Sequence, residues 1–247
     1  MSYKSRTIPI IVLILSMGLF SFNTTNFLKD NFEVNIKHLV QYTTVKNAEM
    51  DICDTTRVEI NLVEVTSNNK TICDKVNNEI IRSITSDEFP TLDAVLHSND
   101  KYNEYATTKV IQMKSLLLDG NIFSVWIQQG ESDCGLTNPN PYTQVLNFDL
   151  KTGNLINLQD IVQTDKIKDF ENIVGQEFIT KYKTEDFDIK KSTYFNMNNK
   201  FGISKKGITF YFDLYEIGPR SSGEAHILIP YSKFKNLIVP GSIITQY

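Results

Sequence analysis

The sequence has few of the residues that metal and redox chemistry use. Its 247 residues include three cysteines and three histidines, and no CxxC or HxxxH pair occurs among them. Zinc sites take most of their ligands from cysteines and histidines at such short spacings. We therefore expect no metal centre and no cofactor.

Motifs of nucleophilic catalysis are also missing. No G-x-S-x-G segment occurs, and Ser221 and Ser222 stand beside Gly223, which is typical of a turn. The carboxylate pairs at 87–88 and 185–186 lie in polar segments, as surface residues do. The sequence predicts no catalytic residue and favours a protein that is not an enzyme.

The charge balance excludes another class of function. The chain carries 25 Lys and Arg against 29 Asp and Glu, a net charge of −4. Nucleic-acid-binding proteins usually present a basic stripe that neutralises phosphates, so nucleic acid is not an expected partner. The mild acidity would suit a cationic partner, although many soluble proteins share it.

An apolar run near the N-terminus indicates export. Lys4 and Arg6 precede the run at 8–20, in the order of a secretory signal. The run is short for a transmembrane helix of about 20 residues. Ser16 and Gly18 offer only a weak cleavage site, so an uncleaved signal anchor is the alternative. We expect an extracytoplasmic protein: secreted, periplasmic or anchored to the membrane through this segment.

The three cysteines allow at most one internal disulfide. Cys53 precedes an expected strand and Cys73 begins an expected helix, so these two could pair. Cys134, in an expected loop, could equally pair with Cys53. The remaining interpretation is that each is a small buried hydrophobe.

Hydrophobic periodicity predicts an α+β fold, with antiparallel hairpins packed against three to four helices. Alternating apolar residues indicate strands at 57–65, 110–118, 122–128, 142–150, 200–204, 208–212 and 224–229. Apolar residues every three to four positions indicate helices at 71–84, after Pro90, from 164 or 165 to 182, and at 232–238. The polar segment 23–48 is expected to be a linker, with an early strand near 38–40 as the alternative.

Three segments of the second half resemble the RsiV-like extracytoplasmic domain family, known from the C-terminal domain of a lysozyme-binding anti-sigma factor. They are NFDLKTGN with LQDI, then FGI with KGITF, and finally YEIGP with Gly223 and IPY, at 147–154 with 158–161, 201–203 with 206–210, and 215–219 with 229–231. Residues 51–105 are similar to the smaller domain that precedes it, related to one found before polysaccharide deacetylases. A Gly-Gly-Ala-His segment frequent in the family is absent here, because residues 135–142 carry prolines and no histidine.

The resemblance implies a domain division and a function. We expect a signal peptide or anchor at 1–22, a linker at 23–48, a smaller α/β subdomain at 49–106 and an RsiV-like domain at 107–247. The implied function is an exported, non-catalytic binding or sensing module that recognises a lysozyme-like protein or a cell-wall glycan. The alternatives are an extracytoplasmic enzyme acting on wall polysaccharide and a structural protein of an envelope assembly.

Four residues are expected to carry binding: Tyr215, Arg220, Glu224 and His226. Tyr215 and Arg220 lie in a loop of glycine and proline and belong to types enriched at interfaces. Glu224 and His226 are two apart on a strand and share one face. With Asp213 they could form a metal or acid–base cluster, but a solvated strand face is the favoured interpretation.

Other aromatic residues are candidates for the same surface. Tyr142 and Tyr211 are interface types as well. Trp126 is expected to pack in the core.

Overall fold

The computed structural model describes residues 31–44, 55–98, 106–133, 141–182, 200–213, 216 and 224–247. The signal segment expected at 1–22 lies outside these ranges. Within them, no helix is both long enough and apolar enough to cross a membrane.

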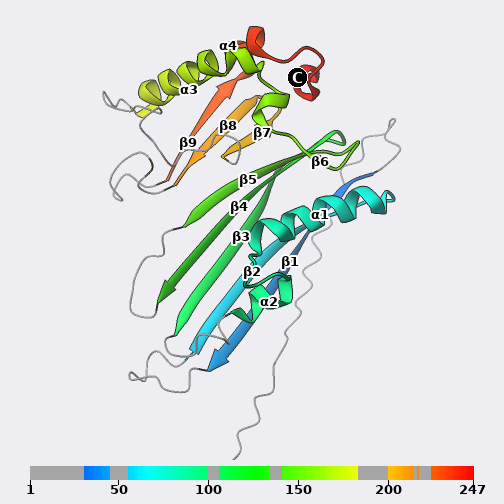
Figure 1. The fold of residues 1–247 in the computed structure, drawn as a ribbon, viewed down its shortest axis with the longest axis vertical. Coiled ribbons are helices and arrows are strands. Elements are labelled where there is room, and N and C mark those ends of the chain that lie inside the picture. The colour runs from blue at the N-terminus through cyan, green and yellow to red at the C-terminus, as the bar shows by residue number, and fades with distance from the viewer. Residues whose placement is uncertain are drawn as a thin grey trace, which may run out of the picture.

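Six strands form the large sheet, in the order β1-β2-β3-β4-β5-β6 (Figure 1). The strands are β1 (Glu33–Thr44), β2 (Thr55–Thr66), β3 (Thr107–Leu118), β4 (Ile122–Asp133), β5 (Tyr142–Asp149) and β6 (Asn154–Leu155). The α+β class with antiparallel hairpins is confirmed, and one pair departs from the antiparallel pattern, because β2 and β3 pair in parallel. Two helices separate these strands in the chain, and such a crossover returns the chain in the same direction.

Strand β1 occupies part of the segment expected to be a linker. It pairs with β2 along its whole length, from Glu33 opposite Thr66 to Thr44 opposite Thr55. Ile36 and Tyr42 are 61% and 60% exposed, so the strand shows no clean alternation of buried and polar residues. The alternative of an early strand was therefore the correct one.

Helices α1 (Lys70–Ile84) and α2 (Leu92–Leu96) cover one face of the large sheet (Figure 1). The predicted stripe of α1 is buried: Ile72, Val76, Ile80 and Ile84. Their core includes strand residues from both sides of the boundary expected at 106/107. The sheet and this core are thus continuous across that position, and the two-subdomain division remains a prediction.

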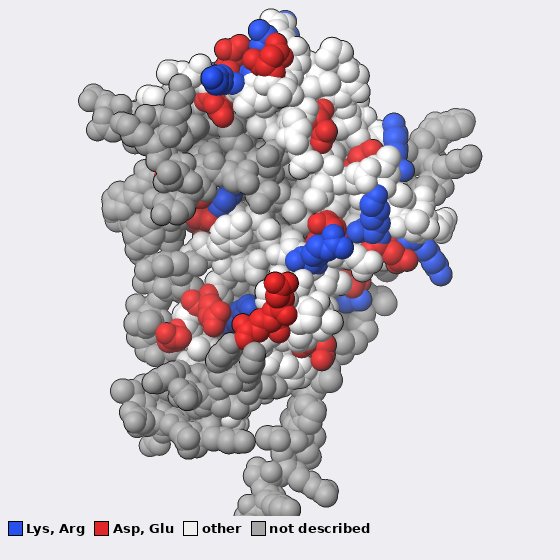
Figure 2. All heavy atoms as spheres, viewed as in Figure 1, with Lys and Arg blue, Asp and Glu red and all other residues white. Residues whose placement is uncertain are grey.

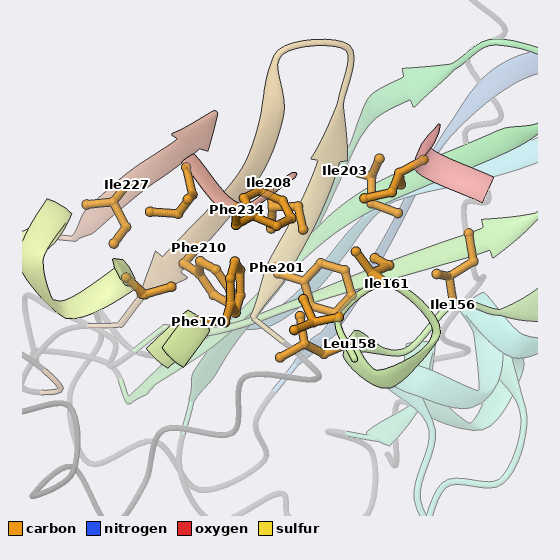
Figure 3. Packing of buried hydrophobic residues seen from close by; sticks show 14 of the residues in the cluster. Ile156, Leu158, Ile161, Phe170, Phe201, Ile203, Ile208, Phe210, Ile227 and Phe234 are labelled. Atoms are coloured by element: carbon orange, nitrogen blue, oxygen red, sulfur yellow. The ribbon is translucent and has the colours of Figure 1, made fainter. Parts of the chain in front are cut away.

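The second sheet has three strands, β7 (Phe201–Ser204), β8 (Gly207–Phe212) and β9 (Ala225–Pro230), in the order β7-β8-β9. Helices α3 (Ile167–Tyr182) and α4 (Tyr231–Phe234) pack on one face of it. Figure 3 shows Phe170, Phe201, Phe210 and Phe234 meeting in this second core. The predicted alternation holds, because Ile208, Phe210, Ile227 and Ile229 are at most 1% exposed.

One buried amide joins the two sheets. The Asn147 side chain on β5 accepts hydrogen bonds from Ser124 Oγ at 2.7 Å and Ile203 N at 3.0 Å. Its Nδ2 donates to the carbonyl oxygen of Phe201 at 2.8 Å. Asn147 thereby pairs with the edge of β7 as another strand would. A buried backbone edge needs such partners, so this amide fixes β7 against the large sheet.

Candidate binding groove between the two sheets

A groove of about 220 Å³ lies where the helix-free faces of the two sheets meet. Strands β3, β4 and β5 line one side, and strands β8 and β9 with Glu224 line the other. We call it the inter-sheet groove; its lining residues are Lys114, Leu116, Trp126, Thr143, Tyr211, Phe212, Glu224, Ala225 and His226.

Trp126 is part of this groove and not of the core, which corrects the expectation. On β4 the neighbouring Val125 and Ile127 are buried in the helix-covered core, and alternation along a strand directs Trp126 to the opposite face. Its side chain is half-buried. From sequence alone, a tryptophan on a strand is expected in the core because it is large and apolar. Which face of the strand the helices cover becomes known only from the tertiary structure.

The opposite side of the groove carries two aromatic rings. Tyr211 on β8 and His226 on β9 are cross-strand partners, and their rings stack with centroids 6.2 Å apart at 29°. Both lie on the face of the small sheet away from α3, because Phe210 and Phe212 point towards that helix. Burial raises the pKa of Tyr211 above its ordinary value, so its hydroxyl stays neutral and can donate a hydrogen bond.

The rim of the groove carries both signs of charge. Lys114 is exposed on β3, and exposed Glu224 accepts a 2.6 Å hydrogen bond from Gln128 Nε2 on β4. On the face drawn in Figure 2, acidic and basic side chains likewise form small mixed groups. Recognition in the groove would therefore depend on local contacts more than on a long-range field.

The end of α3 fixes the position of His226. The Tyr182 hydroxyl accepts from His226 N at 3.0 Å and donates to His226 O at 3.1 Å, and Lys181 Nζ donates to the same carbonyl. The edge of β9 is thus closed by side chains at this residue. His226 is exposed as a whole residue, but its imidazole is shielded from part of the solvent. This partial burial lowers the pKa of the imidazole, and the positive charge of Lys181 lowers it further.

We predict that an NMR titration will place the pKa of His226 below the ordinary value of about 6.5. Lys181→Gln should raise it, because the variant removes one of the two causes. Since the folded-state pKa is depressed, the contribution of His226 to stability is present above about pH 6.5 and is lost as the pH falls through the folded value. An unchanged titration in Lys181→Gln would contradict this assignment.

The alternative of a metal or acid–base cluster of Asp213, Glu224 and His226 is not supported by the groove, whose lining includes Glu224 and His226 without Asp213. Asp213 accepts a hydrogen bond from Thr143 N at 2.9 Å and forms an ion pair with Lys200 Nζ. Among the described residues, no group of three or more His, Cys, Asp and Glu side chains could hold a metal ion. Glu224 and His226 do share the groove, as their spacing predicted.

The remaining predictions for individual residues have mixed outcomes. Tyr215 and Arg220 lie outside the described residues. Cys73 is free and buried, as expected of a small hydrophobe, and contacts Ser67 Oγ; Cys53 and Cys134 lie outside the described ranges. Sequence reasoning missed Lys200, because a lysine between a polar segment and a short strand looks like a surface residue.

The chain is an α+β protein in which two sheets pack together and each carries helices on one face. Comparison with known proteins finds one family model that matches part of the chain. Residues 155–232 match the family described as "Protein of unknown function (DUF3298)". A crystal structure of a DUF3298 family member from Bacteroides fragilis resembles this chain with a TM-score of 0.68 and 18% identity, covering 87% of this chain and 96% of its own.

A second solved structure, a DUF3298 family protein from Pseudomonas aeruginosa PAO1, gives a TM-score of 0.62 and 15% identity, covering 84% of this chain and 95% of its own. At these identities the likeness shows a shared fold. No curated protein matches the chain. These findings do not test the RsiV-like and deacetylase-associated resemblances, which stay predictions.

Proposed function

We propose that the chain is an exported, non-catalytic module that binds an extracellular protein by taking one of its side chains into the inter-sheet groove. The observation that carries the proposal is the placement of Trp126 opposite the stacked pair of Tyr211 and His226. Tryptophan and tyrosine are the residues that most often dominate binding energy at protein interfaces. The apolar N-terminal run supports export.

The size of the groove favours an anchoring side chain. Small-molecule sites usually enclose about 300–1,000 Å³, whereas this groove encloses about 220 Å³. Lys114 and Glu224 at its rim would orient a polar or charged group of the partner. The RsiV-like resemblance makes lysozyme the first protein to test, and a cell-wall glycan is the second ligand.

We predict that the full chain retains lysozyme in a pull-down and that Trp126→Ala or Tyr211→Ala weakens retention about tenfold or more, the size of a hot-spot truncation. Tyr42→Ala is the matched control, because Tyr42 is a 60% exposed aromatic on β1, at the other edge of the large sheet. The measurement is a binding isotherm for each folded variant, with peptidoglycan tested in parallel.

Three outcomes would count against the proposal as stated. If neither lysozyme nor peptidoglycan is retained, its main support is gone. If lysozyme is retained equally by the Trp126→Ala, Tyr211→Ala and Tyr42→Ala variants, the ligand binds outside the groove. Retention of peptidoglycan alone, weakened by the groove variants, would replace the protein ligand with a glycan.

A further inference from the structure

A lysine and two carboxylates are buried together next to Thr143, one of the residues that line the inter-sheet groove. The side chains of Lys200, Asp213 and Glu216 are 3%, 10% and 11% exposed. Lys200 Nζ contacts Asp213 Oδ2 and lies 3.4 Å from Glu216 Oε1. Charged groups are costly to remove from water, so the site favours reactions that turn this ion pair into neutral groups.

The backbone holds Lys200 and Asp213 at the same end of the β7–β8 hairpin. Lys200 directly precedes β7 and Asp213 directly follows β8. Tyr211 N donates to the carbonyl oxygen of Lys200 at 2.8 Å, which extends the strand pairing to this residue. The ring of Tyr142 covers Lys200 Nζ, with its centroid 4.8 Å from the nitrogen. The Lys200 amine and the Asp213 carboxyl group are therefore held in contact in a site that is largely shielded from solvent.

The two carboxyl oxygens of Asp213 have different partners, and so do those of Glu216. Thr143 N donates to Asp213 Oδ1 at 2.9 Å, whereas Oδ2 faces Lys200 Nζ. Glu216 Oε2 accepts from Asp213 N at 2.6 Å, which leaves Oε1 directed at the lysine nitrogen. A backbone donor on one oxygen and a carboxyl beside the nucleophile are the arrangement that acyl transfer uses.

We propose that Lys200 and Asp213 join in an intramolecular isopeptide bond, with Glu216 as the group that transfers the protons. A proton first passes from the Lys200 ammonium to the Asp213 carboxylate, which leaves a neutral amine and a carboxylic acid. Nζ then attacks Cγ, and the charge that develops on Oδ1 is held by Thr143 N–H.

Glu216 completes the exchange. Its protonated carboxyl gives a proton to Oδ2 and regains one from Nζ, so Glu216 ends as it began. The Nζ–Cγ bond forms, the Cγ–Oδ2 bond breaks and Oδ2 leaves as water. Nothing is oxidised or reduced, and no co-reactant is needed.

Two physical arguments support this step. Reactive groups held in contact react as if at very high concentration, with effective molarities of about 10⁵–10⁸ M in well-oriented cases. Burial also raises the pKa of Glu216 above its ordinary value; the hydrogen bond from Asp213 N and the contact with Lys200 oppose this rise, and the negative charge of Asp213 adds to it. A larger fraction of Glu216 is therefore protonated and able to serve as the acid.

The test is peptide mapping of the full chain after folding, denaturation and complete trypsin digestion. Cleavage after Lys205 and Lys206 separates the peptides 192–205 and 207–220. If the bond exists, these two peptides stay joined, Lys200 resists cleavage, and the joined mass is one water below the sum of the two. A dehydrated aspartate without cross-linking would give separate peptides and would count against the proposal.

Three variants define the roles. Lys200→Arg and Glu216→Gln should each yield the uncrosslinked peptides. Lys233→Arg is the control and should stay cross-linked, because Lys233 lies on the surface and pairs with Glu177. A folded wild-type chain that yields only free peptides overturns the proposal, and this result does not depend on whether any variant folds. Full cross-linking in Glu216→Gln would overturn the role of Glu216.

Discussion

Replacing Asn147 with leucine is expected to lower the free energy of unfolding by about 3–5 kcal/mol, because three buried polar groups lose their partner at about 1–3 kcal/mol each. These are Ser124 Oγ, the carbonyl oxygen of Phe201 and the amide of Ile203. All three residues are fully buried. Leucine is similar to asparagine in shape, so the loss would come from hydrogen bonding and not from a cavity.

Urea denaturation of the wild type and the variant measures this change. Asn35→Leu is the matched control, since Asn35 lies exposed on β1 and donates one hydrogen bond to Thr66 Oγ1; we expect a change within about 0.5 kcal/mol. Adding Ser124→Ala to Asn147→Leu should restore about 1 kcal/mol by removing one unpaired group. A loss below about 1 kcal/mol in Asn147→Leu would show that this amide does not hold the sheets together.

Phe170→Ala is expected to cost about 3–5 kcal/mol, the range for a buried phenylalanine that leaves a cavity. Phe170 on α3 is fully buried, with its ring centroid 4.9 Å from that of Phe234 and 6.0 Å from that of Phe210 (Figure 3). These rings come from α4 and β8. The residue thus connects three elements of the small-sheet core.

Thermal and urea unfolding would both report this loss. Tyr42→Ala removes an aromatic ring that is 60% exposed and should change stability by no more than about 0.5 kcal/mol. If Phe170→Ala and Tyr42→Ala destabilise the protein equally, α3 does not depend on this contact. Loss of α3 docking should also release the closure of the β9 edge by Tyr182, so the His226 titration is expected to change in Phe170→Ala.

The local elements were largely predictable from the sequence. The stripe of Ile72, Val76, Ile80 and Ile84 specified α1. The helix predicted after Pro90 is α2, whose N-cap residue Thr91 accepts from Ala94 N at 3.1 Å through its hydroxyl. The strands predicted at 110–118 and 122–128 are β3 and β4, which pair in antiparallel fashion across a turn at Gly120, whose φ is 85°. These signals are local, because burial on one face and turn geometry act over a few neighbouring residues.

The site was predictable only in part. Glu224 and His226 share a groove because strand periodicity alone places them on one face. The position of Trp126 in the same groove depends on which face of the large sheet α1 covers. The burial of Lys200 depends on Asp213 and Glu216 approaching it from after β8. Contacts of this kind leave no local pattern in the sequence, because the packing of whole elements brings the partner residues together.

The sequence by itself determined the α+β class, most helices and strands, and the alternation that buries Ile208, Phe210 and Ile227. Only the tertiary structure decided that β2 pairs with β3 in parallel, that β1 is a strand, and that Asn147 joins the two sheets. The physical reason is the range of the interactions. Periodicity records one-sided burial along a single element, whereas pairing and polar contacts between elements depend on residues distant in the chain.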